Sequence, residues 1–452
     1  MQALSTTIAE WAWGPWLVVL LFGGGLYFLI RTRFQPYRHF GHAFGLISGR
    51  YDNADDPGHI SHRKALSAAL AGTIGLGNIA GVALAIQIGG PGAIFWMWIT
   101  AIIGMATKFF TCSLAVMYRG RDSDGELQGG PMYVIREALP QRMHFLAYLF
   151  AGAGMIGCLP ALQTNQLTQA VRDLVVIEQG WLTPGADPLW FNLGFGLILT
   201  LVLARAVFGG LTRIANVAST LVPIMGGLYV GSALAAILMN LNQVPAMFAL
   251  ILQDAFTGEA AAGGSVLAMI LYGVRRGAFS NEAGIGTESL AHGAAKTQEP
   301  IREGLVAMLG PFFDTLMICT ATAIIILLAG NWQGDSQGVT LTAEAFGYLL
   351  GSVGTIIVFL CIVFFSATTI LTYSFYGGQC ASFLFGTSAR RKYQWVYVGF
   401  VVVAAVVSLD TAINLIDTAF ALMAIPTMIS AFWLAPKVIE AANEYWQKLQ
   451  YE

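Results

Sequence analysis

Long apolar runs, separated by short polar stretches, follow one another along the whole chain. A helix crosses the hydrocarbon core of a bilayer with about 20 apolar residues, so each run predicts a membrane-spanning helix. We predict eleven spans at approximately 12–30, 65–89, 93–117, 145–175, 190–208, 214–240, 263–291, 304–329, 344–384, 394–409 and 412–435. The ninth run is longer than one crossing needs, and it conceals either a break or a helical extension into the cytoplasm.

The composition supports a protein that lives in a membrane. Hydrophobic residues make up 56% of the 452 residues and charged residues only 11%, whereas ordinary soluble domains carry about 25% charged residues. A net charge of −2 provides no basic face for a nucleic acid. The five cysteines all fall in apolar runs, which favours small buried residues over a disulfide framework.

Basic residues fall mostly in alternate loops, which sets the orientation of the spans. The alternation places the N-terminus outside and the C-terminal tail in the cytoplasm, and we expect a bacterial inner membrane. No Lys or Arg precedes the first run, and Arg31 and Arg33 follow it. A secretory signal peptide has the opposite polarity, so the first run is expected to remain as a span.

Two of the runs are interrupted by clustered glycines, at 71–81 and 272–286. Each is the first of five consecutive spans, and because five is odd the second set starts from the opposite side of the membrane. This is the arrangement of an inverted repeat, and interrupted helices at matching positions point to a transporter site. We therefore expect an N-terminal extra span and loop (1–64), a first repeat (65–240), a second repeat (241–435) and a tail (436–452). The alternative is that these glycines only allow close helix packing.

A break of this kind has a chemical use. Unwinding a helix in lipid leaves N–H and C=O groups unpaired, which is tolerated only where something satisfies them. Half-helix N-termini can hold a carboxylate, and freed carbonyls can hold a hard cation such as sodium. An amino-acid zwitterion beside a sodium ion fits both. Gly75-Leu76-Gly77 also matches a dinucleotide fingerprint, but that motif requires a preceding strand and is disfavoured inside an apolar helix.

Four stretches carry a family resemblance, at 75–98, 128–133, 276–284 and 304–316. On these motifs the chain resembles the alanine/glycine:cation symporters (sodium:alanine symporters) from about residue 14 to 435. The resemblance implies a leucine-transporter-type fold with inverted repeats, spans two to six and seven to eleven. It also implies a secondary transporter, not an enzyme, that moves alanine or glycine inward with Na⁺ by alternating access and holds no cofactor. The alternative is a proton-coupled or differently selective amino-acid transporter of the same fold.

The resemblance also implies the residues of the site. The substrate residues that it implies are Thr73, Gly75, Gly77, Asn78, Gln163, Asn165, Phe279, Ser280, Asn281 and Tyr373. The sodium ligands that it implies are Thr73, Gly75, Ser366, Thr368 and Thr369. Plainer roles are open for several of them. Hydroxyl groups in helices often bond to their own helix carbonyls, amides hold membrane helices together, and Tyr373 can be a packing residue.

The sequence departs from the family pattern at three places. Thr111 stands where a glutamate is usual, the pair Thr372-Tyr373 replaces Gly-Trp, and Gly378 replaces another glutamate. Because tyrosine is smaller than tryptophan and adds a hydroxyl group, the change at Tyr373 bears on the choice of substrate.

Charged residues inside apolar runs are functional candidates by default. Asp314 is expected to couple to sodium or a proton, or to form an ion pair with Arg276 or Lys108, and we favour the ion pair. Glu282 follows the second break and could cap an unpaired N–H group. No nucleophile and base pair occurs at membrane depth, which argues against a membrane-embedded enzyme. The six histidines fall in loops or span ends, where a solvated role is expected, and a monomer in the lipid bilayer is the expected state.

Overall fold

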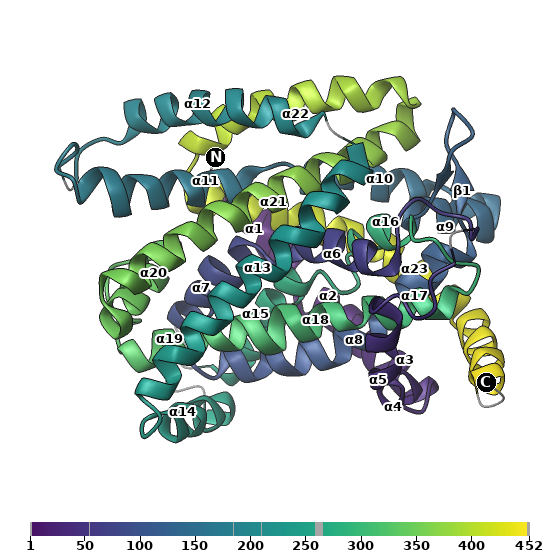
Figure 1. The fold of residues 1–452 in the computed structure, drawn as a ribbon, viewed down its shortest axis with the longest axis horizontal. Helices are drawn as coiled ribbons and strands as arrows, with labels where there is room; N and C mark the ends of the chain where they lie inside the picture. The colour runs from purple at the N-terminus through teal and green to yellow at the C-terminus, as the bar shows by residue number, and fades with distance from the viewer. Residues whose placement is uncertain (1, 54, 184, 209, 258–264, 450–452) are drawn as a thin grey trace.

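The computed structural model describes residues 2–53, 55–183, 185–208, 210–257 and 265–449. Helices make up most of the described chain (Figure 1), and the segments between them are loops and turns. The described residues form one small antiparallel hairpin, of β1 (Gly120–Arg121) and β2 (Leu127–Gln128), in a connection between spans. The prediction of an all-α polytopic fold is confirmed.

Eight helical segments of the described chain are long and apolar enough to cross a membrane. They are Thr6–Arg31, Ala93–Met117 (α8), Gln141–Ile177, Leu189–Val207 (α12), Thr212–Met239, Pro300–Ala329, Ser352–Phe385 (α21) and Leu409–Leu449 (α23). A ninth is the bent pair His62–Thr73 and Gly77–Gly89, whose two halves meet at 53°.

The remaining two predicted spans correspond to helices that are shorter or more charged. The seventh consists of α15 (Val266–Asn281), which has only 16 residues, and the separate short helix α16 (Glu288–His292). Its first two predicted residues, 263 and 264, lie outside the described residues. The tenth is α22 (Ser388–Val406), which begins with three basic residues within its first turns.

The ninth predicted span, 344–384, is two helices. Helix α20 (Gly338–Leu350) ends at Gly351, and α21 begins at Ser352. Gly351 has φ 65° and ψ −158°, a conformation that only glycine adopts without strain. Of the two alternatives raised for this run, the structure shows the break, and it lies at Gly351.

The helices form layers that run across the molecule (Figure 1). Helices α12 and α22 pack together at the top of the view, and α15 packs against α7 (Val82–Gly89) and α8 at the bottom. The connections that charge predicts to be cytoplasmic, including α5 (Phe40–Ile47) and β1, lie at the right end with the C-terminus. Those predicted to be outside, including α14 (Val244–Thr257) and α20, lie at the left end. The segregation agrees with the predicted topology, while the sidedness itself stays a prediction.

Both interrupted helices lie in the interior. From Ala65 onward α6 (His62–Thr73) is buried, and so is the last part of α15 from Gly277 to Asn281. By contrast α12 exposes large apolar side chains such as Leu201, which is 73% exposed. Unpaired backbone groups are tolerated at membrane depth only where protein surrounds them. The buried position of both broken helices meets this condition.

Candidate functional site

The first break lies between Thr73 and Gly77. Helix α6 ends at Thr73, Ile74 turns to ψ 96°, and the helix resumes in the π-helical segment η2 (Gly77–Gly81). The side chain of Asn78 closes the gap, because its Oδ1 accepts a hydrogen bond from the N–H of Gly75 at 2.8 Å. A side-chain oxygen thereby replaces the helical carbonyl that the break removes.

The second break follows Asn281. Glu282 adopts left-handed φ 56°, and the chain stays irregular until α16 begins. The N–H of Ala283 donates to Asn281 Oδ1 at 3.0 Å, so Asn281 supplies the cap. The expectation that Glu282 caps an N–H group is wrong. Its carboxylate instead accepts hydrogen bonds from the hydroxyl groups of Thr287 and Tyr373, because the turn carries it away from the helix end.

The two breaks face each other across a short gap. A Cβ atom on Gly77 would lie 3.6 Å from the ring of Phe279 and 3.7 Å from the backbone of Ser280. These are ordinary van der Waals distances, so the two broken helices are in direct contact at this point. The substrate residues expected from both breaks are therefore brought together at one place in the interior.

Asp314 joins the two breaks. It lies in the π-helical segment η5 (Phe312–Cys319) and is fully buried. Asn78 donates to its Oδ1 at 2.6 Å from the first broken helix, and Ser280 donates to its Oδ2 at 2.8 Å from the second. Thr315 adds a further hydrogen bond to Oδ2 at 2.8 Å. One carboxylate thus accepts neutral donors from both half-helices.

The ion pair that we favoured for Asp314 is wrong. Within the described residues, neither Arg276 nor Lys108 forms a salt bridge with it. Arg276 donates instead to Asp417 of α23 at 2.6 Å, and Arg275 donates to the same oxygen at 3.0 Å. The reason is geometric, because Asp314 already accepts from three neutral donors, one from each broken helix and one from Thr315 of its own segment.

Lys108 lies elsewhere in the interior. Its side chain is 1% exposed, and its Nζ lies 3.1 Å from the position that a Cβ atom on Gly310 would take. No salt bridge to Lys108 occurs in the part of the chain that the structure describes. Close by in sequence, Thr111, which replaces the usual glutamate, donates to Glu288 of the second broken helix at 3.2 Å.

Aromatic rings cover the breaks on the side predicted to face outside. The guanidinium of Arg276 lies 4.8 Å from the centre of the Phe279 ring, and that ring lies 5.6 Å from Phe420 of α23. Asp417 is also held from the first span, because the indole of Trp13 donates to its backbone carbonyl at 2.7 Å. We call this set (Arg275, Arg276, Phe279, Asp417 and Phe420) the outer closure.

The three hydroxyl groups of α21 that are expected at sodium differ in their surroundings. Ser366 donates to Ile362 O at 2.7 Å and Thr368 donates to Phe364 O at 2.9 Å, so both bond to their own helix. Thr369 is fully buried, and its hydroxyl has no partner among the described residues. It faces the first break, since a Cβ atom on Gly75 would lie 2.7 Å from its Oγ1. A buried hydroxyl without a partner is costly unless a ligand completes it.

The other expected substrate residues fall into two groups. Tyr373 faces α6, where a Cβ atom on Gly72 would lie 3.5 Å from its ring, and Gln163 has a buried Oε1 with no partner among the described residues. Asn165 lies elsewhere. Its amide donates to Val407 O at 2.6 Å, and it lines a separate polar cavity of about 280 Å³ together with Arg172.

A buried cluster at the opposite end was missed by the sequence reasoning. His62 begins α6, His292 ends α16, and both rings donate from Nδ1 to the carboxylate of Glu303, His292 at 2.5 Å. All three side chains are at most 1% exposed. The expectation of solvated histidines is wrong for these two. Their hydrogen-bond acceptor is the buried carboxylate of Glu303, which lies in the first turns of α17 (Pro300–Ala307).

Backbone contacts strengthen the same region. Lys296 N donates to Ile60 O at 2.7 Å, and His59 N donates to Ala294 O at 2.8 Å. Arg119 adds hydrogen bonds to the carbonyls of Gly293 at 2.7 Å and Thr297 at 3.2 Å. The segments before α6 and after α16 are thereby bound to each other. We call His62, His292, Glu303 and Arg119 the inner closure.

Comparisons with known proteins agree on the family. The model of the sodium:alanine symporter family matches residues 1–452. A transporter of Haemophilus influenzae described as uncharacterized is 40% identical over 100% of this chain and 97% of its own length. The sodium/alanine symporter AgcS of Methanococcus maripaludis is 37% identical over 98% of this chain and 97% of its own length.

A solved structure supports the architecture. The crystal structure of MhsT in complex with L-phenylalanine covers 85% of this chain and 98% of its own with a TM-score of 0.57. At 12% identity this likeness shows the fold alone. MhsT has the leucine-transporter fold, so the expected architecture with two inverted repeats is confirmed.

Proposed function

The chain belongs to the sodium:alanine symporter family, whose members are transporters rather than enzymes, and from this we propose that it carries alanine or glycine into the cell together with Na⁺. The observation that carries the proposal is the meeting of two broken helices beside the unpartnered hydroxyl of Thr369. We further propose that it acts as a monomer in a bacterial inner membrane, with its N-terminus outside and its C-terminal tail in the cytoplasm.

The proposed substrate fits the chemistry of the breaks. The helix that resumes at Gly77 turns its N-terminal end toward the first break, where the helix dipole favours a carboxylate. The rings of Phe279 and Tyr373 stand beside Gly77 and Gly72 at the first break, and we propose that they limit the size of the substrate side chain. Thr73, Asn78, Gln163, Ser280 and Asn281 complete the set of substrate residues that we propose. Asn165, which contacts the loop after α22, is proposed to act at the outer approach.

The proposed sodium site lies between the first break and α21. Thr369 supplies the unpartnered hydroxyl, and Thr73 and Gly75 at the break supply backbone oxygens. Ser366 and Thr368 can still offer lone pairs, because each hydroxyl uses only its proton in the bond to its own helix. Neutral oxygen ligands suit a hard monovalent cation when the substrate carboxylate lies nearby.

Transport requires the two closures to open in turn. The outer closure joins α15 to α23, and the inner closure joins α6 and α16 to α17. Bound sodium and substrate would tie the two breaks to α21 and allow the whole group to move together. Each positive charge that enters adds about 2.3 kcal/mol per 100 mV of membrane potential.

The direct test is uptake of labelled alanine, glycine and serine into proteoliposomes. An inward Na⁺ gradient is expected to drive accumulation of alanine or glycine above equilibrium. Choline in place of Na⁺ serves as the control. Proton coupling is the second candidate, because Asp314 and Glu282 are buried carboxylates without a salt bridge in the described chain. Accumulation driven by a pH gradient alone, without Na⁺, would overturn the sodium proposal in favour of this one.

We expect Thr369→Ala to weaken the response to sodium much more than it weakens folding. The substitution removes the unpartnered hydroxyl, so the Na⁺ concentration for half-maximal uptake should rise about tenfold, equivalent to about 1.4 kcal/mol. Ser374→Ala on the same helix is the control, since Ser374 donates to Leu371 O at 2.7 Å. Equal Na⁺ activation in the Thr369 variant and the wild-type protein would remove Thr369 from the site.

We expect Tyr373→Trp to shift uptake from alanine toward glycine. The larger indole takes space beside the first break, and it also removes the hydroxyl group bonded to Glu282. Tyr373→Phe separates the two effects because it removes only the hydroxyl. Competition between labelled glycine and unlabelled alanine measures the shift. An unchanged ratio in the tryptophan variant would assign Tyr373 to packing.

A further inference from the structure

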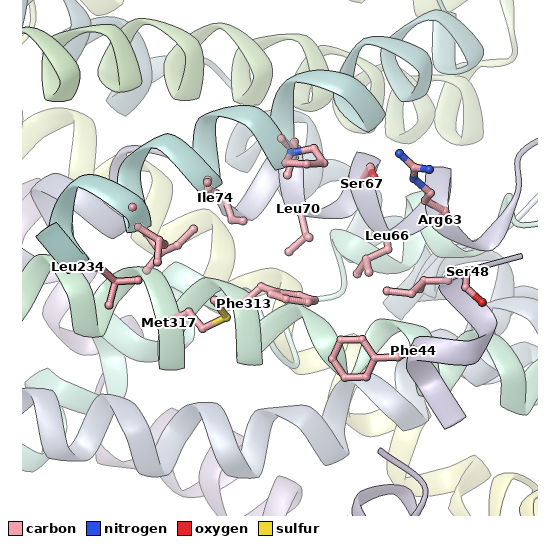
Figure 2. A pocket seen from close by; sticks show the side chains of 18 residues that line it. Phe44, Ser48, Arg63, Leu66, Ser67, Leu70, Ile74, Leu234, Phe313 and Met317 are labelled. Carbon is pink, nitrogen blue, oxygen red and sulfur yellow. The ribbon is translucent and has the colours of Figure 1, made fainter. Parts of the chain in front are cut away.

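A long apolar groove runs along the outer side of the first broken helix (Figure 2). Its volume is about 690 Å³. Four elements form it, namely α5, α6, the helix α13 (Gly210–Met239) and η5. Side chains that line it include Phe44, Leu66, Leu70, Leu234, Phe313 and Met317. None of these residues belongs to the substrate or sodium sites proposed above.

Glycines widen the groove on the side that α13 forms, because they carry no side chains. Around the Cβ positions of Gly226, Gly227 and Gly231 no atom lies within 4 Å, so these positions border open space. The neighbouring Leu234 is 51% exposed, and Phe44 on the facing element is 38% exposed. The groove is therefore open along the side of the molecule, between α6 and α13, which both belong to candidate membrane spans. An apolar hollow in this position suits an acyl chain, which needs no hydrogen bonds.

One end of the groove is polar. Figure 2 shows Arg63 and Ser48 at one end, with Leu234 and Met317 toward the other. Arg63 is exposed, and no salt bridge to it occurs within the described ranges. It stands at the start of α6, on the side predicted to face the cytoplasm. A basic residue at the mouth of an apolar groove is complementary to a lipid with an anionic head group.

We propose that the groove binds an anionic phospholipid of the cytoplasmic leaflet. One acyl chain lies along the glycines of α13, and the phosphate contacts Arg63 and Ser48. A zwitterionic lipid would fill the same hollow but would leave the guanidinium with less compensation. The charge of Arg63 therefore selects the head group of the lipid, and the apolar wall of α13 holds its acyl chain.

The floor of the groove lies directly behind the transport site. Ile74, the residue at which α6 breaks, lines it, and so do Phe313 and Ile318 on either side of Asp314. A bound chain would pack α6 against α13 and resist outward movement of that half-helix. This consequence rests on the proposed transport function, whereas the binding of lipid does not.

The test labels the full-length protein in nanodiscs with a phosphatidylglycerol that carries a photoactivatable diazirine in its acyl chain. A phosphatidylcholine with the same modified chain is the matched probe. We expect peptides from α6 and α13 to be labelled about fivefold more strongly by the anionic probe, as one basic contact predicts. Equal labelling by the two probes would overturn the assignment of an anionic lipid.

Two variants locate the site. Gly227→Phe fills the groove and should abolish labelling of α6, whereas Gly399→Phe is the control, because Gly399 is exposed on α22 and also borders open space. Arg63→Gln should lower the preference for the anionic probe to near unity, and Arg205→Gln at the end of α12 should leave it unchanged. Unaltered labelling of α6 in Gly227→Phe would overturn the proposal.

Uptake measured in the same nanodisc lipids, after transfer to proteoliposomes, separates the two proposals. Labelling requires only a folded protein, which a melting curve checks for each variant. Specific labelling without sodium-driven uptake would contradict the proposed function and leave lipid binding supported. Sodium-driven uptake without specific labelling would support the proposed function and contradict lipid binding.

Discussion

Asp314→Asn is expected to reduce the initial rate of sodium-driven uptake by at least about tenfold. This corresponds to about 1.4 kcal/mol or more of lost stabilisation where the two broken helices meet. The carboxylate accepts hydrogen bonds from Asn78, Ser280 and Thr315. An asparagine keeps one acceptor oxygen and turns an N–H₂ group toward a donor. Each buried donor left without an acceptor costs about 1–3 kcal/mol.

The measurement is initial uptake of labelled alanine at saturating Na⁺, with the melting temperature as the check on folding. Asp335→Asn is the matched control, because Asp335 is exposed in the loop before α20. Wild-type uptake in the Asp314 variant would show that contact between the two half-helices through this carboxylate is dispensable. A lower melting temperature with wild-type uptake would assign Asp314 to stability alone.

Glu303→Ala is expected to have the second large effect, on the inner closure. Removing one partner of a buried charged pair costs about 3–5 kcal/mol, because the remaining groups keep their desolvation penalty. Here two buried imidazole N–H groups, on His62 and His292, would lose their acceptor at once. We expect a lower melting temperature and a protein that rests with its cytoplasmic side open.

Two measurements check this expectation. The melting temperature should fall by several degrees. The second measurement uses a cysteine in place of Ser67, which is buried in α6. A maleimide should react with this cysteine faster in the Glu303→Ala variant than in the protein with native Glu303. Glu299→Ala is the matched control, since Glu299 lies four residues away and contacts Lys448 in an exposed pair at 3.1 Å. Such exposed pairs contribute about 0–1 kcal/mol. Equal reactivity of the cysteine in the Glu303 and Glu299 variants would show that Glu303 and its two histidines do not keep the cytoplasmic side closed.

The sequence predicted the parts of the structure that follow from local composition. Runs of apolar residues located the spans, and clustered glycines located both breaks, because few other residues permit a helix to unwind in lipid. The resemblance added Thr369 and Gly75, which the structure brings face to face. The contents of the ninth run were only partly predicted, since its single feature of note, Gly351, looks like many other glycines.

Partners distant in sequence could not be predicted. Arg276 and Asp417 are separated by 141 residues, and His62 and Glu303 by 241. Hydrophobic periodicity places a residue at a depth and on a face, but it does not identify the residue opposite. The assignment of Asp314 to an ion pair failed for this reason. Its neighbours turned out to be neutral donors that only the meeting of both breaks brings together.

The indole of Trp13 bears on which part of the outer closure moves. The first span stands outside the two repeats, yet it holds the backbone of Asp417 and also bonds to α23 through Thr6 and Asn414 at 3.1 Å. We expect this extra helix to keep α23 as the stationary side of the entrance. Admission of substrate from outside would then depend on α15 swinging away with its two arginines, while the carboxylate that they leave behind stays in place to receive them again.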